Sequence, residues 1–535
     1  MFSRVVSSLI FLNLWLLSFE VLADRFLFIS TNVAFSHIAF NGRLADILID
    51  AGHEVDFVIP LFNNFVNING TKKANVTRVH LDITDDLERR ILKLEWWNNV
   101  FESKGSPHEP EKFKSMFADY CESMLSKSDF LDHLRSRNYT IGMAETIDPC
   151  SFSLFHLLGI KVTHELSALP LMEHTQVNHG ISLDPNIPLT FNHEQITPIE
   201  SLFERARNWF MYLSFRWGLL EEHPVNKLMK RMIASDFPTS EELMGRADFV
   251  WLNTNKFIDF PRSLPAKVKQ IGGVGVDQPQ ELDEILKSIF ERASKGVILV
   301  SFGSIVNTTH MKTAIRDAFL DAFAQFPDYE FIWKVTDVNG NNLSRLASTR
   351  YPNVHLVNWM NQPSILSRSV AFISHLGLNS LNEAAQFGVP MIAIPFFADQ
   401  QFNTAVMLKR KLGVYLNRRQ ITTKTLSDAI RTVLENPVYR NAAKELSRKI
   451  TDVPFTPREV FIRSVEFSSR QGPLNEWQLP AAKINFIQQN SLDLLALAIT
   501  TLFAFLYTTF VVSRRAIRLM SLWIGRTSEQ QKKNL

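Results

Sequence analysis

The sequence has 535 residues, enough for at least two hydrophobic cores. Its composition, 46% hydrophobic and 21% charged, is that of a globular protein with a membrane contribution. The 57 Lys and Arg nearly balance the 54 Asp and Glu, which argues against a nucleic-acid-binding protein. The two cysteines, Cys121 and Cys150, are too few for a disulfide framework or a metal site, and they form either one bridge or two buried thiols.

The N-terminus predicts a cleavable signal peptide over residues 1–23. Arg4 precedes a long apolar run, and Val21-Leu22-Ala23 ends it just before Asp24. We therefore expect the folded chain to begin near Asp24.

A strand, a helix and a second strand open the body of the chain. Residues 24–30 and 54–60 predict buried strands, and residues 38–51 predict an amphipathic helix between them. This order predicts a parallel, doubly wound sheet, which binds ligands at the carboxyl ends of its strands. His37 stands where the first strand meets the helix. A helix N-terminus disfavours the imidazolium and would keep this titratable side chain neutral, although most histidines at such places are structural.

The first domain is expected to extend to residue 275. Its further strands are predicted at 138–146, 160–166 and 249–253, with a helix at 150–159. Glu145 lies at the end of one strand, and Asp148 follows three residues later. A linker is expected at 276–291.

A second domain is predicted over residues 292–490. A strand at 296–301 leads into Phe302-Gly303-Ser304, where glycine permits close backbone approach and Ser304 can donate a hydrogen bond. Further elements are strands at 330–335 and 354–357 and helices at 311–325, 425–435, 439–451 and up to about 469.

The stretch from Trp359 to Gln400 predicts an anion site. A strand at 370–374 is followed by a turn and a helix at 379–387, for which Asn379 and Ser380 are candidate N-caps and Gly388 the terminator. A strand is expected at 390–397. A helix N-terminus at the carboxyl edge of a sheet binds anions, and a diphosphate fits this chemistry.

The C-terminal region predicts a membrane anchor. Residues 492–512 form an apolar run of about the ~20 residues that span a bilayer. Arg514, Arg515 and Arg518 follow it, so residues 513–535 are expected to be a cytosolic tail. Lys532 and Lys533 have the placement of a dilysine retrieval signal of endoplasmic reticulum membrane proteins. The glycosylation sequons expected on a lumenal body are Asn69, Asn75, Asn138, Asn307 and Asn342.

The spacing within the 359–400 stretch resembles the signature of the UDP-glycosyltransferases, the family that includes the animal UDP-glucuronosyltransferases. The matching residues are Trp359, Gln362, His375, Gly377, Ser380, Glu383, Asp399 and Gln400. The resemblance covers essentially the whole chain. It implies the GT-B arrangement, in which two Rossmann-like domains enclose a cleft, with the acceptor on the first and the UDP-sugar on the second. Leu376 departs from the family, which prefers a small residue there, and is expected to narrow the turn beside the phosphates.

Carried over residue by residue, the resemblance implies a UDP-sugar site. Three side chains would hold the uridine: Trp359 by stacking on uracil, Gln362 by hydrogen bonding, and Glu383 by accepting from the ribose hydroxyls. The turns around the diphosphate would supply Ser304, His375, Gly377, Asn379 and Ser380. Asp399 and Gln400 would bind sugar hydroxyls.

The resemblance also implies the catalytic groups. His37 would take the proton from an acceptor hydroxyl, and Glu145 would orient it at a place where vertebrate members carry Asp. Asp148 is the alternative orienter, and a loop acid without a role is the remaining interpretation. Direct attack from the opposite face would invert the anomeric carbon, and no metal or cofactor besides the UDP-sugar co-substrate is expected.

The resulting prediction is an endoplasmic reticulum enzyme that transfers a sugar, with glucuronate favoured, to a small lipophilic acceptor, as in detoxification. Two alternatives stay open. One is a transferase that uses UDP-glucose. The other is a catalytically weak protein that binds nucleotide sugar and associates with active paralogues. Homo- or hetero-oligomers are compatible with either.

Overall fold

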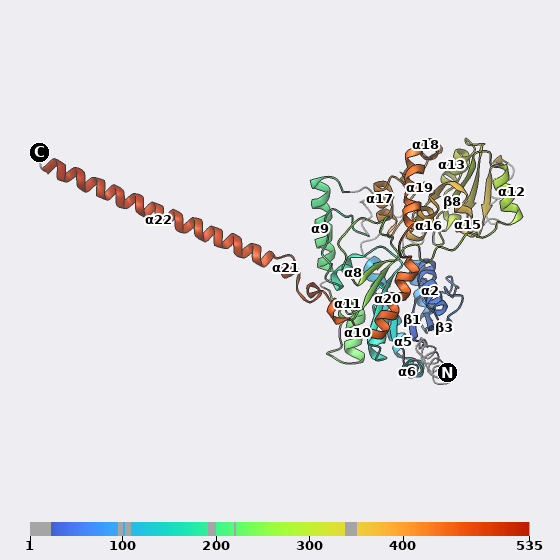
Figure 1. Ribbon diagram of the computed structural model, residues 1–535, viewed down its shortest axis with the longest axis horizontal. Coiled ribbons are helices and arrows are strands. Elements are labelled where there is room, and N and C mark those ends of the chain that lie inside the picture. Colours follow the sequence, from blue (N-terminus) through green and yellow to red (C-terminus); the bar gives the residue numbers. More distant parts are fainter. Residues whose placement is uncertain are drawn as a thin grey trace, which may run out of the picture. The chain divides into compact units, whose positions relative to one another are not determined.

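The computed structural model of the chain describes residues 23–94, 100–101, 109–190, 199–218, 221–337 and 350–533. The expected signal peptide except Ala23, the sequon at Asn342 and the last two residues lie outside this range. The chain divides into two compact units. The larger unit comprises Met1–His179 with Leu183–Gln478, and it contains both β-sheets (Figure 1).

The first sheet has seven parallel strands in the order β3-β2-β1-β4-β5-β6-β7. They are β1 (Arg25–Ile29), β2 (Glu54–Pro60), β3 (Asn75–Val79), β4 (Ile141–Glu145), β5 (Val162–Ser167), β6 (Phe249–Leu252) and β7 (Val268–Gln270). The strand order reverses between β1 and β4, and such a reversal leaves a crevice at the carboxyl ends of the two strands.

The second sheet has six parallel strands in the order β10-β9-β8-β11-β12-β13. They are β8 (Gly296–Ser301), β9 (Tyr329–Lys334), β10 (Val354–Val357), β11 (Ser369–Ser374), β12 (Met391–Ala393) and β13 (Gly413–Tyr415). Its order reverses between β8 and β11. The chain thus has the two parallel, doubly wound sheets of the predicted α/β fold.

Helices cover both faces of each sheet, so most residues of the central strands are buried. In β1, Leu27 and Ile29 enter one apolar core while Phe26 and Phe28 enter the core on the opposite face. The helices associated with the first sheet are α2 (Phe35–Asp50), α3 (Thr84–Leu92), α5 (Glu109–Leu125), α6 (Ser128–Ser136), α7 (Pro149–Leu157), α8 (Glu173–Asn178), α9 (Leu202–Gly218), α10 (Pro224–Met232) and α11 (Ser240–Gly245). The later helices are α12 (Glu284–Arg292), which lies largely within the segment expected as a linker, α13 (Thr313–Phe323), α15 (Gln362–Leu366), α16 (Leu378–Phe387), α17 (Gln400–Lys409), α18 (Thr423–Glu435), α19 (Pro437–Thr451) and α20 (Pro457–Gln471).

Helix α20 returns from the second sheet to the first. Phe461 packs edge-on against Trp251 of β6, with ring centroids 4.8 Å apart. Ser468 donates to Asp248 at 2.7 Å, and its hydroxyl lies 3.0 Å from His164 Nε2. Burial lowers the pKa of His164 to about 3, so this histidine is a neutral structural group that helps to fix α20.

The strand expected at 390–397 is shorter than predicted, because β12 ends at Ala393. The next residues leave the sheet and turn over Gln400, whose side-chain oxygen accepts hydrogen bonds from the backbone N–H groups of Phe396 and Phe397 at 2.7 and 3.2 Å. The apolar run therefore reflects burial of a loop rather than a continuous strand.

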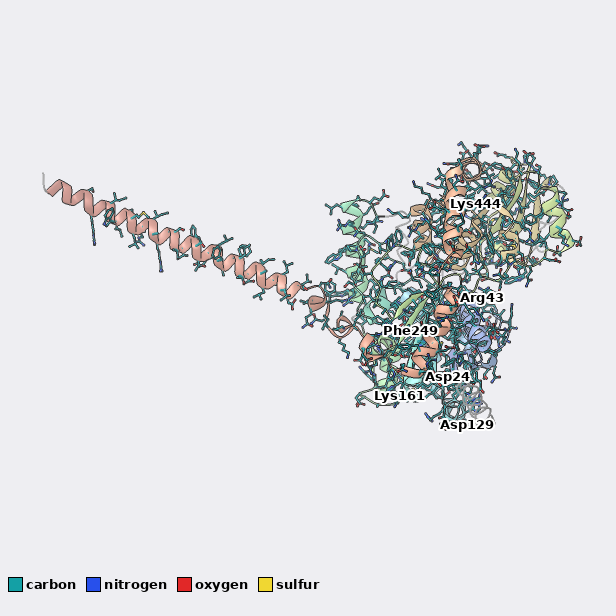
Figure 2. All side chains as sticks on the ribbon, in the orientation of Figure 1. Asp24, Arg43, Asp129, Lys161, Phe249 and Lys444 are labelled. Atoms are coloured by element: carbon teal, nitrogen blue, oxygen red, sulfur yellow. A yellow bond between two sulfur atoms is a disulfide. The ribbon has the colours of Figure 1, made fainter. Side chains whose placement is uncertain are left out.

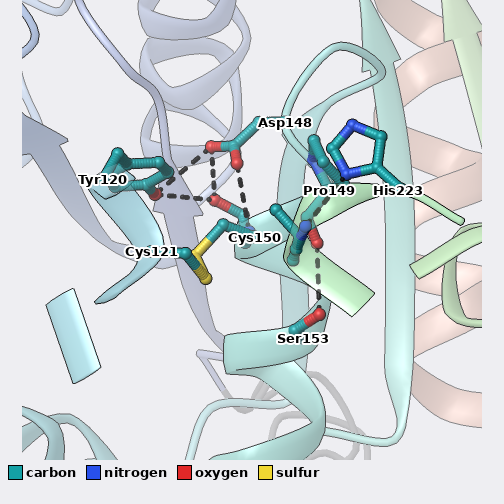
Figure 3. The surroundings of a disulfide bond; sticks show 9 residues. Tyr120, Cys121, Asp148, Pro149, Cys150, Ser153 and His223 are labelled. Carbon is teal, nitrogen blue, oxygen red and sulfur yellow. Dashed lines mark hydrogen bonds between the residues drawn. A yellow bond between two sulfur atoms is a disulfide. The ribbon is translucent and has the colours of Figure 1, made fainter. Parts of the chain in front are cut away.

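The two cysteines form a disulfide between α5 and α7, with Cα atoms 5.5 Å apart (Figure 3). Beside it, Asp148 caps the N-terminus of α7 and accepts from the Ser151 N–H at 3.1 Å and the Ser151 hydroxyl at 2.6 Å. Burial raises the pKa of Asp148 to about 6. The bridge, which the sequence left open, thus fastens α5 to the end of α7 that follows β4.

Replacing both cysteines by alanine is expected to lower the free energy of unfolding by about 3–4 kcal/mol, because the bridge closes a loop with a sequence separation of 29. The measurement is the thermal transition of the detergent-solubilised chain with and without a reductant. Reductant should lower the wild-type transition toward that of the variant and leave the variant unchanged. Equal transitions for both oxidised proteins would contradict the stabilising role.

The smaller unit comprises Gly180–Ser182 and Leu479–Leu535. Its main element is α22 (Leu492–Lys533), in which residues Leu492–Arg526 are long and apolar enough to cross a membrane. The helix is longer than the predicted span of 492–512. Figure 2 shows its side chains directed outward along the helix. One C-terminal helix among the described residues is thus a candidate single-pass membrane anchor.

Candidate functional site

The predicted site residues follow the strands at which the two sheets reverse. In the first sheet His37 comes after β1 and Glu145 ends β4. In the second sheet Ser304 comes after β8 and His375 after β11. Both reversals therefore direct candidate polar groups to the carboxyl edge of their sheet, where doubly wound sheets bind ligands.

His37 and Glu145 are in direct contact. His37 lies in the first turn of α2, and its Nδ1 is 3.0 Å from Glu145 Oε1. The glutamate is almost completely buried and also accepts a hydrogen bond from the Ala168 N–H at 3.1 Å. Glu145 thus fixes one ring nitrogen of His37, which leaves Nε2 as the nitrogen that can exchange a proton with a ligand.

The expectation that the helix N-terminus keeps His37 readily neutral is wrong in direction. Burial is the largest influence and lowers the pKa of His37, but the charge and hydrogen bond of Glu145 and the charge of Asp399 together outweigh it. The pKa of His37 is therefore raised. Glu145 belongs to the first domain and Asp399 to the second, so both domains act on this one imidazole.

A buried amide positions the loop that leads to His37. Asn32 donates to the carbonyl oxygens of Asn63 at 2.7 Å and Val66 at 3.0 Å, and its own oxygen accepts from the Phe62 N–H at 2.7 Å. These bonds tie the segment between β1 and α2 to the chain that follows β2. Asp148, the alternative orienter, is engaged at the disulfide, so Glu145 is the carboxylate that meets His37.

Helix α16 begins one residue before the predicted start, at Leu378, with Gly377 as its N-cap. Asn379 and Ser380 are therefore in the first helical turn and are not the cap. Glycine offers no side chain to the exposed backbone N–H groups of this turn, which leaves them available to an anion. Gly388 ends the helix in the left-handed conformation, as predicted.

The His375 ring lies between two glycines. A Cβ atom added to Gly303 or to Gly377 would come within 2.7 Å of His375 Nε2. Burial lowers the pKa of His375 to about 4, so the ring is neutral at physiological pH and can donate a hydrogen bond without carrying charge.

Leu376 adopts a backbone conformation that is rare for a bulky residue, with φ of +62°. Its side chain is buried in the core of the second domain, so the core rather than the turn accommodates its bulk. Asn403 of α17 holds the strained turn by donating to the Leu376 carbonyl at 3.0 Å and also donates to Asp399 Oδ2 at 2.7 Å. One amide thus connects the turn before α16 to Asp399.

Asp399 is buried beside this amide. Burial raises its pKa to about 6, against the opposing effects of Asn403 and of the His37 charge. The side-chain oxygen of Gln400 accepts hydrogen bonds from the backbone of its own loop, as described above. Ser304 is exposed at the turn after β8.

Three further predicted residues form the outer end of the site. Gln362 donates to Glu383 at 2.6 Å and to Ser380 at 3.3 Å. Burial raises the pKa of Glu383 to about 7. Trp359 is 64% exposed, as an aromatic platform for a planar ligand would be, and Lys334 Nζ lies 4.8 Å from its ring centroid.

The two domains touch along α16. Asn253, just after β6, donates to Asn379 at 2.7 Å and accepts from Asn382 through its carbonyl at 2.7 Å. A small cavity lies at this contact, and Arg43 of α2 is among the residues that line it. Its lining residues are Phe40, Arg43, Asn253, Gly273, Gly275, Val276, Asn379, Asn382 and Glu383. The cavity therefore adjoins Glu383 and does not include His37.

Several neighbours of the site were not predicted. Phe35 of the first domain packs edge-on against Trp359 of the second, with centroids 5.5 Å apart. Lys334 donates to the Gly303 carbonyl at 2.9 Å. Asn253 and Asn403 carry no sequence pattern that indicates their roles, whereas Lys334 lies within the strand predicted at 330–335 and Phe35 lies two residues before His37. Among the described residues, no three His, Cys, Asp or Glu side chains are grouped as metal ligands.

Comparison with known families gives one match across nearly the whole chain. Residues 26–523 match the sequence model of the UDPGT family, described as UDP-glucoronosyl and UDP-glucosyl transferase.

Individual relatives agree with this match. A Caenorhabditis elegans protein named provisionally as UDP-glucuronosyltransferase ugt-50 is 28% identical over 489 residues, which cover 89% of this chain and 92% of that protein. UDP-glucosyltransferase 2 of Dactylopius coccus is 28% identical over 349 residues, 64% of this chain and 65% of that protein.

Solved structures agree on the fold. The crystal structure of CalG4, the calicheamicin glycosyltransferase, covers 85% of this chain and is itself covered completely, with a TM-score of 0.57 and 15% identity. At this identity the likeness shows a shared GT-B fold, as the sequence predicted.

Replacing Gly377 by alanine is expected to weaken UDP binding at least about tenfold, a loss of roughly 1.4 kcal/mol. The new methyl group would displace the His375 ring, while the backbone φ of −58° suits alanine, so the clash is the only change. Titration calorimetry with UDP on the detergent-solubilised chain measures the affinity. The control is Gly218→Ala, where an added Cβ meets nothing within 4 Å. Wild-type affinity in Gly377→Ala would show that the His375 ring takes no part in binding.

Proposed function

Because this chain belongs to the family of UDP-glucuronosyl and UDP-glucosyl transferases, we propose that it transfers glucuronate from UDP-glucuronate to a hydroxyl group of a small lipophilic acceptor. The observation that carries the proposal is the contact between His37 Nδ1 and Glu145 Oε1 at 3.0 Å. It combines a titratable base with a buried carboxylate that orients it, at the carboxyl edge of the first sheet.

In the proposed reaction, His37 Nε2 takes the proton of the acceptor hydroxyl. The oxygen attacks the anomeric carbon of the donor as the bond to UDP breaks, which inverts that carbon. The resulting imidazolium is stabilised by Glu145, whose reach of one extra methylene over aspartate is sufficient for the hydrogen bond.

The second domain would bind the donor and stabilise the departing UDP. The uncapped first turn of α16, with Gly377, Asn379 and Ser380, would face the diphosphate together with His375 and Ser304. This arrangement places hydrogen-bond donors where negative charge develops. Trp359, Gln362 and Glu383 would bind the uridine, and Asp399 and Gln400 the sugar hydroxyls. We expect no metal or further cofactor to take part.

The choice of glucuronate rests on the names of relatives such as the nematode protein, while the Dactylopius coccus relative is named for UDP-glucose. UDP-glucose is therefore the second candidate donor. The oriented His37 argues against the interpretation of the chain as a catalytically weak partner of other transferases. Homo- or hetero-oligomers are compatible with an active transferase and with a partner protein.

We also propose that the protein is a glycoprotein of the endoplasmic reticulum with lumenal catalytic domains. A disulfide within the first domain suits an oxidising compartment. The sequons, the predicted signal peptide, the basic residues after the apolar run and the terminal lysine pair all indicate the same orientation. The structure describes the backbone of Lys532 and Lys533 but not their side chains.

Membranes that contain the chain, permeabilised with detergent, are expected to form conjugates of a mixed panel of phenols and apolar alcohols with UDP-glucuronate. Product is measured by mass spectrometry, beside UDP-glucose as the competing donor. His37→Ala should lower the rate by about 10²–10⁴-fold, the usual contribution of a general base, while UDP affinity stays unchanged.

Each other outcome has a defined meaning. Conjugates formed only with UDP-glucose would replace the proposed donor and keep the mechanism. Full activity in His37→Ala would eliminate the proposed base. No product with either donor, from a chain that still binds UDP, would favour the role of a partner protein.

The pH dependence of kcat/KM tests the pair of His37 and Glu145. The base must be neutral to accept a proton, and its pKa is raised, so activity should fall as the pH decreases through a value above about 6.5. Glu145→Gln removes the negative charge that raises this pKa. We therefore expect the acid limb to move to lower pH and the maximal rate to fall.

The matched control is Asp148→Asn, which changes a buried acid that has no contact with His37 and caps α7 instead. Its acid limb should coincide with that of the wild type. An acid limb that stays in place in Glu145→Gln would show that Glu145 does not set the pKa of the base.

A further inference from the structure

Helix α9 exposes a continuous apolar stripe. Phe203, Phe210 and Trp217 recur every seven residues and are 76%, 66% and 77% exposed. Ala206 and Leu213 lie between them on the same side, at the spacing of about 3.6 residues per turn. The stripe also has two neighbours along one edge, Leu202 and Trp209, which are exposed as well. We call these seven residues the α9 stripe.

The opposite side of α9 packs on the first domain through polar groups. Asn208 and Tyr212 are its buried residues. Asn208 donates to the backbone carbonyls of Ile187 at 2.8 Å and Pro185 at 3.2 Å. These bonds fix the rotation of the helix about its axis, so the exposure of the stripe is a consequence of specific contacts.

This orientation is the reverse of that in a water-exposed surface helix, which turns its apolar stripe to the core and its polar side to solvent. Here Asn208 and Tyr212 form the buried side, while the four aromatic rings of the stripe are exposed. Contiguous exposed apolar surface of this kind marks a site that contacts another apolar phase or a protein. The side chains that border the stripe are compatible with a lipid headgroup region: Arg205 and Arg216 on one side and Arg207 and Ser214 on the other.

The chain itself favours a bilayer as the partner. The larger unit ends at Gln478, and the apolar segment of α22 begins at Leu492. Residues 479–491 can span at most about 45 Å even when fully extended. If α22 crosses a membrane, this tether keeps the first domain close to the surface of that same membrane.

We propose that α9 is a second, interfacial membrane-binding element, which inserts the α9 stripe among the lipid headgroups and upper acyl chains. Phe and Trp have the amphipathic or apolar rings that bind at this depth. The proposal rests on the anchoring of α22 and is independent of the sugar donor and of the acceptor.

The test uses the full-length chain with Phe210→Cys. The native cysteines are joined in a disulfide, so an environment-sensitive nitrobenzoxadiazole maleimide reacts with the introduced thiol. In phosphatidylcholine vesicles, we expect doxyl-labelled lipid to quench this probe several-fold more strongly than the same probe at Ser136→Cys, and aqueous iodide to quench it less. Ser136 is an exposed position on α6, which Figure 1 shows well away from α9 on the larger unit.

Adding Phe203→Ser and Trp217→Ser to the labelled chain should abolish the lipid quenching and restore access to iodide, because the remaining stripe is too small to anchor the helix. UDP binding by each labelled chain verifies that it is folded. If the Phe210→Cys chain does not bind UDP, the probe is placed at Trp217→Cys instead. Equal quenching by lipid and iodide at positions 210 and 136 would overturn the proposal. A second result would also overturn it: no lipid quenching, together with energy transfer between differently labelled copies that increases with the protein-to-lipid ratio. A second copy of the chain would then cover the stripe.

Discussion

The hydrogen bond between His37 and Glu145 depends on the parallel arrangement of β1 and β4. These strands are neighbours in the sheet although about 110 residues separate them. Strands β2 and β3 lie on one side of β1, and the chain then returns to place β4 on the other side. Residues that end or follow the two strands must therefore meet at one edge. The second sheet repeats the arrangement at β8 and β11, and it sets the turn of Gly303 against the ring of His375. The whole site is a consequence of these two reversals.

The burial of polar groups then determines their chemistry. His375 and His37 are both imidazoles at the carboxyl end of a strand, but the first has its pKa lowered by burial and the second has its pKa raised by two carboxylates. One is thus a neutral donor at physiological pH and the other an ionisable group. Environment, rather than residue type, separates their functions.

Much of this arrangement was predictable from the sequence. The boundaries of β2, β8 and β10 agree with the prediction to the residue, because each is rich in Val, Ile or Leu and has a Gly, Pro or Asn at or beside one end. The start of α16 and the end of β12 were predicted less well, since Gly377 gives no capping signal and the loop after Ala393 is buried like a strand. Strand β3 escaped prediction because it lies at the edge of the sheet and only one of its five residues, Val79, is buried, so it has no apolar run. Asn403 and Asn253 act through single long-range hydrogen bonds, which leave no periodic pattern.

The electrostatic contact between Asp399 and His37 crosses from one domain to the other. Any displacement that separates the domains removes the influence of Asp399 and makes His37 a weaker base. By reciprocity, protonation of His37 favours the arrangement in which Asp399 lies near it, since the two equilibria share one free energy of coupling. Proton uptake by His37 and the approach of the two domains are therefore thermodynamically linked.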